Sequence, residues 1–567
     1  MLTPSAKAKA DAWLAGPYDE ETKAAIRAMS DDALQSAFGK DLSFGTAGMR
    51  GIVGPGTNRL NQYTIRAATQ GLANYINSQP TTLPKRVAIS YDCRLSSPEF
   101  ATQAALVLIG NDIEALLCPT LMPTPYLSFI CREKNCCAGI MITASHNPPE
   151  YNGYKVYWSD GAQVLPPHDQ GIISEVQDVT PTKVRIGSPD DPRLIIADES
   201  LIESYIKAIY PLQLCLKENQ NHGDQLKVIY TPLHGAGVML MEKALNAWGF
   251  TNLTYVEEQK QPDGHFPTTK SPNPEDPKAL TLGHKLLAAT NGDILLASDP
   301  DADRLGVSIM HKNEPRFLTG NEIAILCTDH ILKKRAHDDT LPSNAAIIKS
   351  IVTTPLLDTL AKTYDVTCLS VLTGFKYIGQ KIHTFEKTHE HTFIFGAEES
   401  HGYLIGTHSR DKDGIASACL LCEIALDAKL QNQTLIDRLE AIYKRHGYYT
   451  SQLINIALPH GLESMIATIG ELRSHPPKTI GDLHVRSIDD YQASQSRNLK
   501  TGRLTKLKLP RSNVLVFNLG SHVRIIIRPS GTEPKLKIYG LAMHPSDPTI
   551  AHDLLERTLL RTKKWFS

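Results

Sequence analysis

The chain has 567 residues, and its 59 lysine and arginine residues nearly balance 60 aspartate and glutamate residues. At roughly 150 residues per domain, this length predicts about four domains, each able to bury its own core. The balanced charge excludes a global field that would attract nucleic acid or an anionic membrane, so local groups must hold any anionic ligand.

The cysteines and the apolar segments indicate the compartment. The ten cysteines are scattered, and neither Cys136-Cys137 nor Cys419 with Cys422 has a second ligand pair at zinc spacing, so core cysteines are the better interpretation. The N-terminus lacks a signal-peptide core, and no run of about 18 apolar residues occurs. The sequence therefore predicts a reducing, cytoplasmic setting and no membrane segment.

Helical and strand patterns alternate through the first part of the chain. Residues 12–37 have a helical pattern and lead into a glycine-rich loop at 44–51 that contains Arg50. Glycines let backbone amides approach an anion and Arg50 adds a charged fork, although such a loop is more often a simple turn. The elements predicted next are a helix through 65–76, a strand at 86–91, a helix from 98, a strand at 113–117 and a helix near 126. This alternation predicts a largely parallel, doubly wound sheet.

A short apolar strand at 139–143 leads to a hydroxyl and an imidazole, Ser145 and His146, before a turn at 147–149. Ligands of open α/β sheets bind beyond the carboxyl ends of the strands. Ser145, with His146 beside it and Lys155 after it, is therefore well placed for chemistry. A turn of Ser, Asn and Pro without any chemistry is the alternative.

The alternation restarts after residues 178–195, a stretch rich in Pro, Asp and Ser that predicts the first domain boundary there or just after it. Residues 261–277 hold five prolines and predict a long loop over the surface or over a cleft. From Tyr448 onward, the pattern predicts a smaller antiparallel α+β domain. The intervening elements are predicted as strands at 227–230 and 253–256, a loop at 232–237, a helix at 238–248, a helix at 321–334, a strand at 345–349, a helix from 355, a strand at 366–371 and a helix at 435–445; the tail has strands at 514–518, 523–527 and 536–539 and a helix at 550–564.

Three aspartates, Asp299, Asp301 and Asp303, follow a predicted strand at 292–298 and precede Arg304. Carboxylates at this spacing on a turn repel one another strongly unless a hard cation lies between them. Oxygen ligands in small number favour Mg²⁺, and the glycine and terminal glutamate of a calcium loop are missing. The alternative is a solvated acidic turn.

Two further loops carry groups suited to a phosphosugar. Residues 528–535 offer the fork of Arg528, two hydroxyls and a glycine, which is the composition of a phosphate-binding loop, with a plain hairpin turn as the alternative. Glu398 and Ser400 on one strand-end loop are suited to bind sugar hydroxyls, and residues 374–376 present a lysine.

Four motifs in this order resemble the site motifs of the α-D-phosphohexomutase superfamily: residues 143–148, 299–304, 396–400 and 528–532. The resemblance spans nearly the whole chain. It implies an α/β protein of four domains around a central cleft, with three mixed-sheet α/β domains and a C-terminal α+β domain like the TATA-binding protein. The implied domains are 1–200 with the phosphoserine loop, 201–318 with the metal-binding loop, 319–447 with the sugar-binding loop and 448–567 with the phosphate-binding loop.

The resemblance also implies the roles of the site residues. Ser145 would carry a phosphoryl group, Asp299, Asp301 and Asp303 would hold Mg²⁺ beside it, and glucose 1,6-bisphosphate would act as the phosphorylating activator. The remaining implied roles are catalysis for His146, Lys155, Arg50 and Arg304, substrate binding for Gly374, Phe375, Lys376, Glu398 and Ser400, and phosphate binding for Arg528, Ser530, Gly531 and Thr532.

The implied activity is a phosphosugar mutase that interconverts the 1-phosphate and 6-phosphate of a hexose, glucose and also mannose, as a cytoplasmic monomer or dimer with no nucleic-acid or membrane partner. Other members of the superfamily carry GEMSGH where this chain reads GAEESHG, so specificity among glucose, mannose and pentose phosphates stays open. The alternatives are a phosphopentomutase, a glucose 1,6-bisphosphate synthase, a metal-dependent sugar phosphatase and a non-catalytic sugar-phosphate binding protein.

Overall fold

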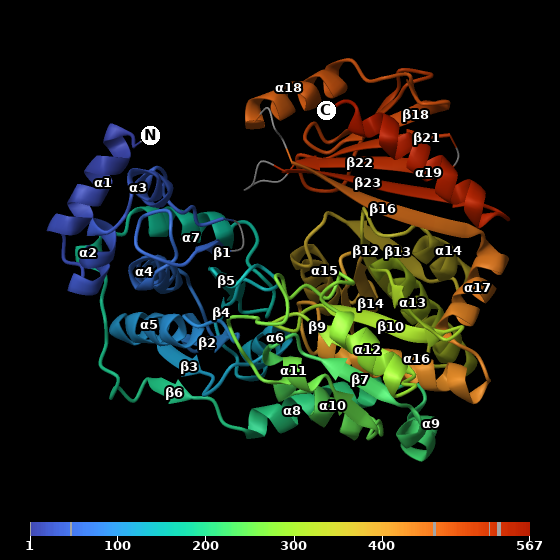
Figure 1. Ribbon diagram of the computed structural model, residues 1–567, viewed down its shortest axis with the longest axis horizontal. Coiled ribbons are helices and arrows are strands. Elements are labelled where there is room, and N and C mark those ends of the chain that lie inside the picture. The colour runs from blue at the N-terminus through green and yellow to red at the C-terminus, as the bar shows by residue number, and fades with distance from the viewer. Residues whose placement is uncertain (1, 46–47, 458–460, 521, 530–534, 567) are drawn as a thin grey trace. The chain divides into compact units, whose positions relative to one another are not determined.

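The computed structural model describes residues 2–45, 48–457, 461–520, 522–529 and 535–566 (Figure 1). The chain divides into two compact units. Unit 1 comprises residues 1–319, 378–396 and 400–434, and unit 2 comprises residues 320–377, 397–399 and 435–567. Every helix among the described residues is too short or too polar to cross a membrane.

The N-terminal stretch predicted as helical at 12–37 forms three short helices: α1 (Pro4–Ala15), α2 (Glu20–Arg27) and α3 (Asp31–Phe38). Thr3, Asp19 and Ser30 each accept a hydrogen bond from a backbone N–H of the helix that follows, which fixes the three starting points. The first helix ends before Pro17, which is unable to donate to a helix interior.

The first sheet of unit 1 has the strand order β1-β5-β4-β2-β3-β6. β2 pairs in parallel with β3 and β4, and β3 with β6, whereas β5 is antiparallel to both β1 and β4. The sheet is therefore mixed, and its parallel part matches the alternation read from the sequence. Its strands are β1 (Gly48–Ile52), β2 (Arg86–Tyr91), β3 (Glu114–Leu117), β4 (Ala138–Ile142), β5 (Tyr151–Trp158) and β6 (Leu194–Ile196); its helices are α4 (Gln62–Ser78), α5 (Ser97–Gly110), α6 (Thr124–Glu133) and α7 (His168–Gln177).

Part of the predicted glycine-rich loop at 44–51 is strand, because β1 begins at Gly48. Gly48 has φ +124°, and a Cβ atom there would lie 1.8 Å from the carbonyl oxygen of Tyr154 on β5. Only glycine allows so close a pairing of the two strands. Thr46 and Ala47 of this motif lie outside the described residues.

The second sheet of unit 1 has the order β11-β10-β9-β7-β8. β7 is parallel to β8 and β9, and β10 is antiparallel to β9 and β11. Residues 261–277, predicted as a long loop, contain neither helix nor strand. The strands are β7 (Val228–Thr231), β8 (Leu253–Tyr255), β9 (Ile294–Ser298), β10 (Leu305–His311) and β11 (Glu314–Leu318); the α-helices are α8 (Ser200–Ile209), α9 (Leu216–His222), α10 (Met241–Ala247), α11 (Glu257–Lys260), α12 (Thr281–Ala289) and α16 (Gly414–Leu430), with 3-10 turns at Pro181–Lys183, Tyr210–Leu212, Gly223–Gln225 and Ala236–Met239.

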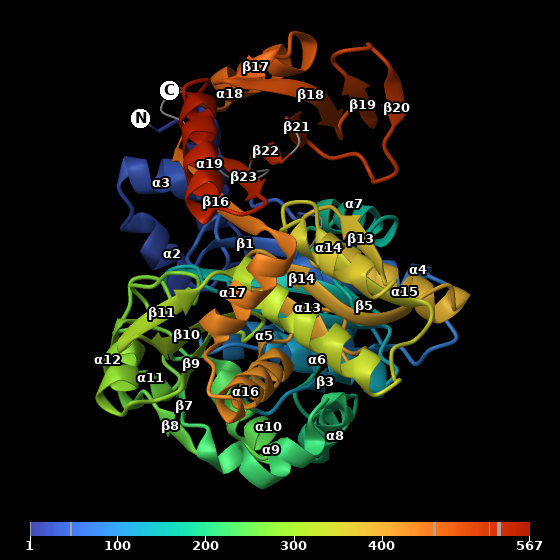
Figure 2. The ribbon, with the colours of Figure 1, turned by 90° about the vertical axis from the view of Figure 1, so that its right-hand side faces the viewer.

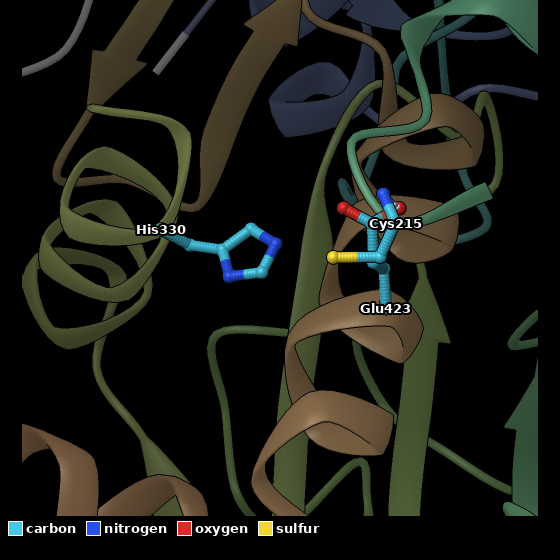
Figure 3. A group of neighbouring side chains, drawn as sticks. All are labelled: Cys215, His330 and Glu423. Carbon is cyan, nitrogen blue, oxygen red and sulfur yellow. Dashed lines mark hydrogen bonds between the residues drawn. The ribbon is translucent and has the colours of Figure 1, made fainter. Parts of the chain in front are cut away.

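The cysteines of the described structure are all free, and eight of the ten are buried, in agreement with their interpretation as core residues. Figure 3 shows Cys215 beside the carboxylate of Glu423, which is fully buried in α16. Glu423 accepts hydrogen bonds from the backbone N–H of Cys215 (2.9 Å) and from the Asn219 amide (2.7 Å).

Unit 2 contains β12 (Ala345–Ser350) and β13 (Thr367–Val371), which confirm the strands predicted at 345–349 and 366–371 and which pair in parallel. The helices of this part are α13 (Gly320–His337), α14 (Leu356–Thr363) and α17 (Leu435–His446). Two elements, α15 (Lys376–Thr388) and β14 (Thr392–Glu398), have residues in both units, and β15 (Gly402–Ile405) belongs to unit 1.

The C-terminal sheet has the order β16-β23-β22-β21-β18-β19-β20, and each strand pair described in it is antiparallel, as predicted for the tail. α19 covers one face, where Leu555 and Leu559 join the core, and β19 and β20 form the far edge (Figure 2). The elements are β16 (Tyr448–Ala457), α18 (Gly461–Ser474), β17 (Thr479–Ile480), β18 (Leu483–Asp490), β19 (Gln495–Asn498), β20 (Leu504–Lys506), β21 (Leu515–Leu519), β22 (Val523–Pro529), β23 (Lys535–His544) and α19 (Pro548–Lys563).

Candidate active site

Ser145 lies in unit 1, three residues beyond the end of β4, and is 3% exposed. Its backbone has φ +51°, in the left-handed region that residues other than glycine rarely adopt. The hydroxyl donates to Asp299 Oδ2 at 2.6 Å, and His146 Nδ1 lies 3.1 Å from the same oxygen. The strand end predicted to carry chemistry is thus joined to the aspartate motif that lies far along the sequence.

The three aspartates follow β9 and are buried, and one carboxylate oxygen from each lies within 4.8 Å of the others. Asp301 Oδ1 and Asp303 Oδ1 are buried without a hydrogen-bond partner among the described atoms. Buried carboxylate oxygens without a hydrogen bond are costly, and a hard divalent cation satisfies them. The residues present therefore fit a Mg²⁺ site.

Burial, together with the charges of Asp301 and Asp303, raises the pKa of Asp299 well above its usual range. Burial acts in the same direction on Asp301, but the ammonium of Lys155 outweighs it and lowers the pKa of Asp301. The pKa values of Asp299 and Asp301 are thus shifted in opposite directions within one cluster. Strongly shifted pKa values of this kind are concentrated at functional sites.

Two lysines face the triad. Lys155, on β5, places its Nζ 2.7 Å from Asp301 Oδ2 and 3.6 Å from Asp303 Oδ2. Burial lowers the pKa of Lys155, but the two aspartates raise it more, so that the net shift is upward and the ammonium stays protonated. Lys412 lies 3.0 Å from Asp303 Oδ2 and 3.2 Å from Asp411 Oδ1.

Lys412 is a site residue that the sequence reading did not find. The only signal was a run of charged residues, 408–413, which is buried in the structure although such runs are usually solvated. Thr124, at the start of α6, was also missed, and its hydroxyl donates to Asp301 Oδ2 at 2.8 Å.

Both predicted arginines lie near the Ser145 loop, residues 143–150 between β4 and β5. Arg50, on β1, donates to the Asn147 side chain at 3.0 Å and is exposed. Arg304 pairs with Glu275, and its backbone N–H donates to Asp299 Oδ1 at 3.0 Å. Burial and the positive charges of Arg304 and Arg50 lower the pKa of His146 well below its usual range, which keeps the imidazole neutral.

The predicted sugar-binding residues divide between the two units. In unit 2, Glu398 accepts a hydrogen bond from the backbone N–H of Gly374 at 2.7 Å, and Phe375 is buried. Lys376 begins α15, with its Nζ 5.6 Å from the Tyr377 ring centroid. Ser400 belongs to unit 1.

The predicted phosphate-binding loop is described only in part. Arg528 is the penultimate residue of β22 and is half-buried. The loop residues that contribute hydroxyls and backbone amides to this prediction, Ser530, Gly531 and Thr532, lie outside the described residues.

Comparisons with known proteins agree with one another. Residues 41–183, 203–312 and 319–446 match the α/β/α domains I, II and III of phosphoglucomutase/phosphomannomutase. The chain is similar to a phosphoglucomutase of Staphylococcus aureus, with 35% identity over 550 residues, 96% of this chain and 97% of that protein. A phosphoglucomutase of Staphylococcus saprophyticus is 34% identical over 536 residues, which cover 93% and 95% of the two chains.

Two solved structures have the same fold. A phosphoglucomutase/phosphomannomutase family protein from Burkholderia thailandensis aligns with a TM-score of 0.67 and 19% identity, covering 92% of this chain and 97% of that one. The open form of the phosphoglucomutase parafusin from Paramecium aligns with a TM-score of 0.66 and 18% identity, covering 93% and 95%.

Proposed function

Because this chain belongs to the α-D-phosphohexomutase superfamily, we propose that it is a hexose-phosphate mutase that carries the transferred phosphoryl group on Ser145. The observation that supports this role most strongly is the hydrogen bond from the Ser145 hydroxyl to Asp299, inside a buried aspartate triad. The substrate is a phosphosugar, and glucose phosphate is the first candidate because the similar staphylococcal proteins are phosphoglucomutases.

In the proposed cycle, phosphoserine 145 gives its phosphoryl group to the free O6 or O1 of a hexose monophosphate. The bond from phosphorus to Ser145 Oγ breaks as the bond to the sugar oxygen forms, and the proton of the sugar hydroxyl passes to Ser145 Oγ through the groups beside it. The bisphosphate formed then turns around and returns its other phosphoryl group to Ser145 Oγ. Asp299, Asp301 and Asp303 would hold Mg²⁺, which would neutralise charge on the phosphoryl group in a loose transition state.

The proton transfers fall to groups beside Ser145. The neutral imidazole of His146 is within reach of the Ser145 hydroxyl and accepts its proton when that oxygen is phosphorylated. Asp301 and Asp303 hold Lys155 as an ammonium, which stabilises negative charge on the phosphoryl group. By similarity to the superfamily, Lys155 also takes part in general acid/base chemistry. Arg50 and Arg304 add positive charge near the same loop.

The substrate-binding groups are proposed by similarity to the superfamily. Glu398 and Ser400 bind sugar hydroxyls, with residues 374–376 beside Glu398. Arg528 and residues 530–532 bind the distal phosphate, which a mutase needs and a hydrolase does not. Glucose 1,6-bisphosphate serves as the activator that phosphorylates Ser145.

The deciding experiment is a panel of glucose 1-phosphate, mannose 1-phosphate and ribose 1-phosphate, given with Mg²⁺ and a trace of glucose 1,6-bisphosphate. Products are identified directly, and the phosphorylation of Ser145 is checked by intact mass. We expect glucose 6-phosphate as the main product. Failure to convert any of the three sugars would overturn the proposal, and phosphate release at the rate of isomerisation would favour a phosphatase.

The same panel, extended by an incubation of glucose 1-phosphate with 1,3-bisphosphoglycerate and repeated with Ser145→Ala, separates the relatives within the superfamily. Ribose 1-phosphate as the preferred substrate would indicate a phosphopentomutase. Net formation of glucose 1,6-bisphosphate from 1,3-bisphosphoglycerate would indicate the synthase. Ser145→Ala should abolish turnover, and unchanged turnover in that variant would refute the phosphoserine cycle.

A further inference from the structure

Arg94, three residues beyond the end of β2, contacts the loop of residues 143–150 that carries Ser145. The side chain is 1% exposed, and its guanidinium donates to backbone carbonyls of that loop and to the carbonyl of Tyr151, the first residue of β5. The distances are 2.6 Å to Ser145 O, 2.6 Å to Asn147 O, 2.8 Å to Pro148 O and 2.7 Å to Tyr151 O. One planar, permanently charged group thus fixes three carbonyls of a loop that is neither helix nor strand, together with the first carbonyl of β5.

Asp92 ties the other end of the loop to the same arginine. Its Oδ2 lies 3.2 Å from Arg94 Nε and accepts the Thr143 hydroxyl at 2.6 Å. The Thr143 oxygen in turn accepts the backbone N–H of Ser145 at 2.8 Å. The two sides of Ser145, its N–H and its C=O, are therefore both connected to the Asp92–Arg94 ion pair.

The proline-rich loop at 261–277 packs against Arg94 and against the loop that carries Ser145. The Phe266 ring centroid lies 5.1 Å from the Arg94 guanidinium carbon, and the Ser271 hydroxyl donates to the His146 carbonyl at 2.9 Å. At Gly264, a Cβ atom would lie 2.7 Å from the Leu95 backbone nitrogen, so the two segments are in close contact. Residues 261–277 thus contact both Arg94 and the loop that carries Ser145.

From these contacts we propose that Arg94 and Asp92 are positioning residues of the mutase reaction, which hold Ser145 in its left-handed backbone conformation with Oγ on Asp299. The proposal rests on the proposed role of Ser145. The described side-chain hydrogen bonds of Arg94 and Asp92 run to Thr143, Ser97 and backbone carbonyls near Ser145, and none of them reaches Ser145 Oγ. They act by keeping Ser145 Oγ, which carries the phosphoryl group, in its position beside Asp299. A displacement of about 1 Å in such a site can lower the rate a hundredfold.

The test compares Arg94→Met with Arg86→Met. Methionine keeps an unbranched apolar stem that reaches the position of arginine Nε and removes every donor. Arg86 lies on the same β2 strand and pairs with Glu114 at 2.7 Å near the surface, so Arg86→Met is the matched control. We expect kcat to fall on the order of a hundredfold in Arg94→Met with little change in KM, and to stay unchanged in Arg86→Met.

Hydrogen–deuterium exchange supplies a readout that does not depend on activity. The peptide covering residues 143–152 should exchange faster in Arg94→Met than in the wild type or in Arg86→Met, whether or not the substrate panel identifies a substrate. A wild-type protein inactive on the panel overturns the proposed function alone, whereas unchanged exchange in Arg94→Met overturns the positioning role.

A second pair of variants covers the case in which Arg94→Met does not fold. Thr143→Val removes the hydroxyl that links Asp92 to the Ser145 N–H, and Thr143→Ser retains it. Lowered kcat in Thr143→Val with near wild-type kcat in Thr143→Ser supports the proposal. Equal kcat in both, or a folded Arg94→Met within twofold of wild type, overturns it.

Discussion

Lys155→Met should destabilise the protein in the absence of Mg²⁺ and should be rescued by Mg²⁺. The lysine ammonium is the nearest positive charge to Asp301, at 2.7 Å, and both side chains are almost fully buried. Removing one partner of a buried ion pair costs about 3–5 kcal/mol, because the other charge is left uncompensated. For a domain of 150–250 residues, 3 kcal/mol corresponds to a fall in Tm of roughly 6–12 °C.

The control is Lys9→Met, which breaks an exposed ion pair of the same length with Asp41, 2.7 Å. Exposed pairs contribute about 0–1 kcal/mol, so its Tm should stay within roughly 3 °C of the wild type. Tm is measured by differential scanning calorimetry with EDTA and with saturating Mg²⁺. Mg²⁺ should restore more of the Tm of Lys155→Met than it adds to the wild type, because a cation replaces the lost lysine charge.

Equal Tm values for Lys155→Met and the wild type in EDTA would refute the electrostatic reasoning about the triad. A loss of Tm that Mg²⁺ leaves unchanged would show instead that the lysine stem, and not its charge, stabilises the site.

Three further outcomes follow from single residues. Asp19→Asn should remove the loss of stability that the N-terminal helices show in acid, as measured by Tm at a series of pH values. The hydroxyl of Tyr63 lowers the pKa of Asp19 to about 2. The Asp19 carboxylate therefore stabilises the fold above pH 4, and this stabilisation is lost as the pH falls toward 2. Because Asp19 is exposed, this contribution should be small, and identical pH profiles for the two proteins would contradict it. Gly48→Ala should lower Tm or prevent folding, since its Cβ would overlap the Tyr154 carbonyl, and a wild-type Tm would refute the close pairing of β1 with β5. Ser145→Ala should still bind Mg²⁺ in calorimetric titration with less than tenfold change in Kd, and lost binding would mean that the hydroxyl is needed to build the triad.

Local patterns predicted most strands and helices well, because a strand such as β2 or β9 is a short apolar run bounded by turn residues. They failed where the outcome depends on a distant partner. β1 contains two glycines and an arginine and reads as a loop, and it is a strand because β5 pairs with it. The helical pattern at 12–37 covers three helices, because the caps at Asp19 and Ser30 start new helices within it.

The same limit applies to the site. Ser145 and the aspartates stand out because hydroxyl and carboxylate groups at strand ends form a local pattern. Arg94 and Lys412 do not stand out, because an arginine after a strand and a lysine in a charged run are ordinary surface features in sequence. Their meaning comes only from the carbonyls and carboxylates that they contact in the fold.

The most direct test of the central claim is the charging and discharging of Ser145. The protein is incubated with Mg²⁺ and glucose 1,6-bisphosphate, freed of ligand, and analysed by intact mass and peptide mapping before and after addition of glucose 1-phosphate. The proposed mechanism predicts that Ser145 carries one phosphoryl group and that glucose 1-phosphate removes this group at a rate comparable to kcat. An actively isomerising protein with no phosphate on Ser145, or with one that glucose 1-phosphate fails to remove, would contradict the account.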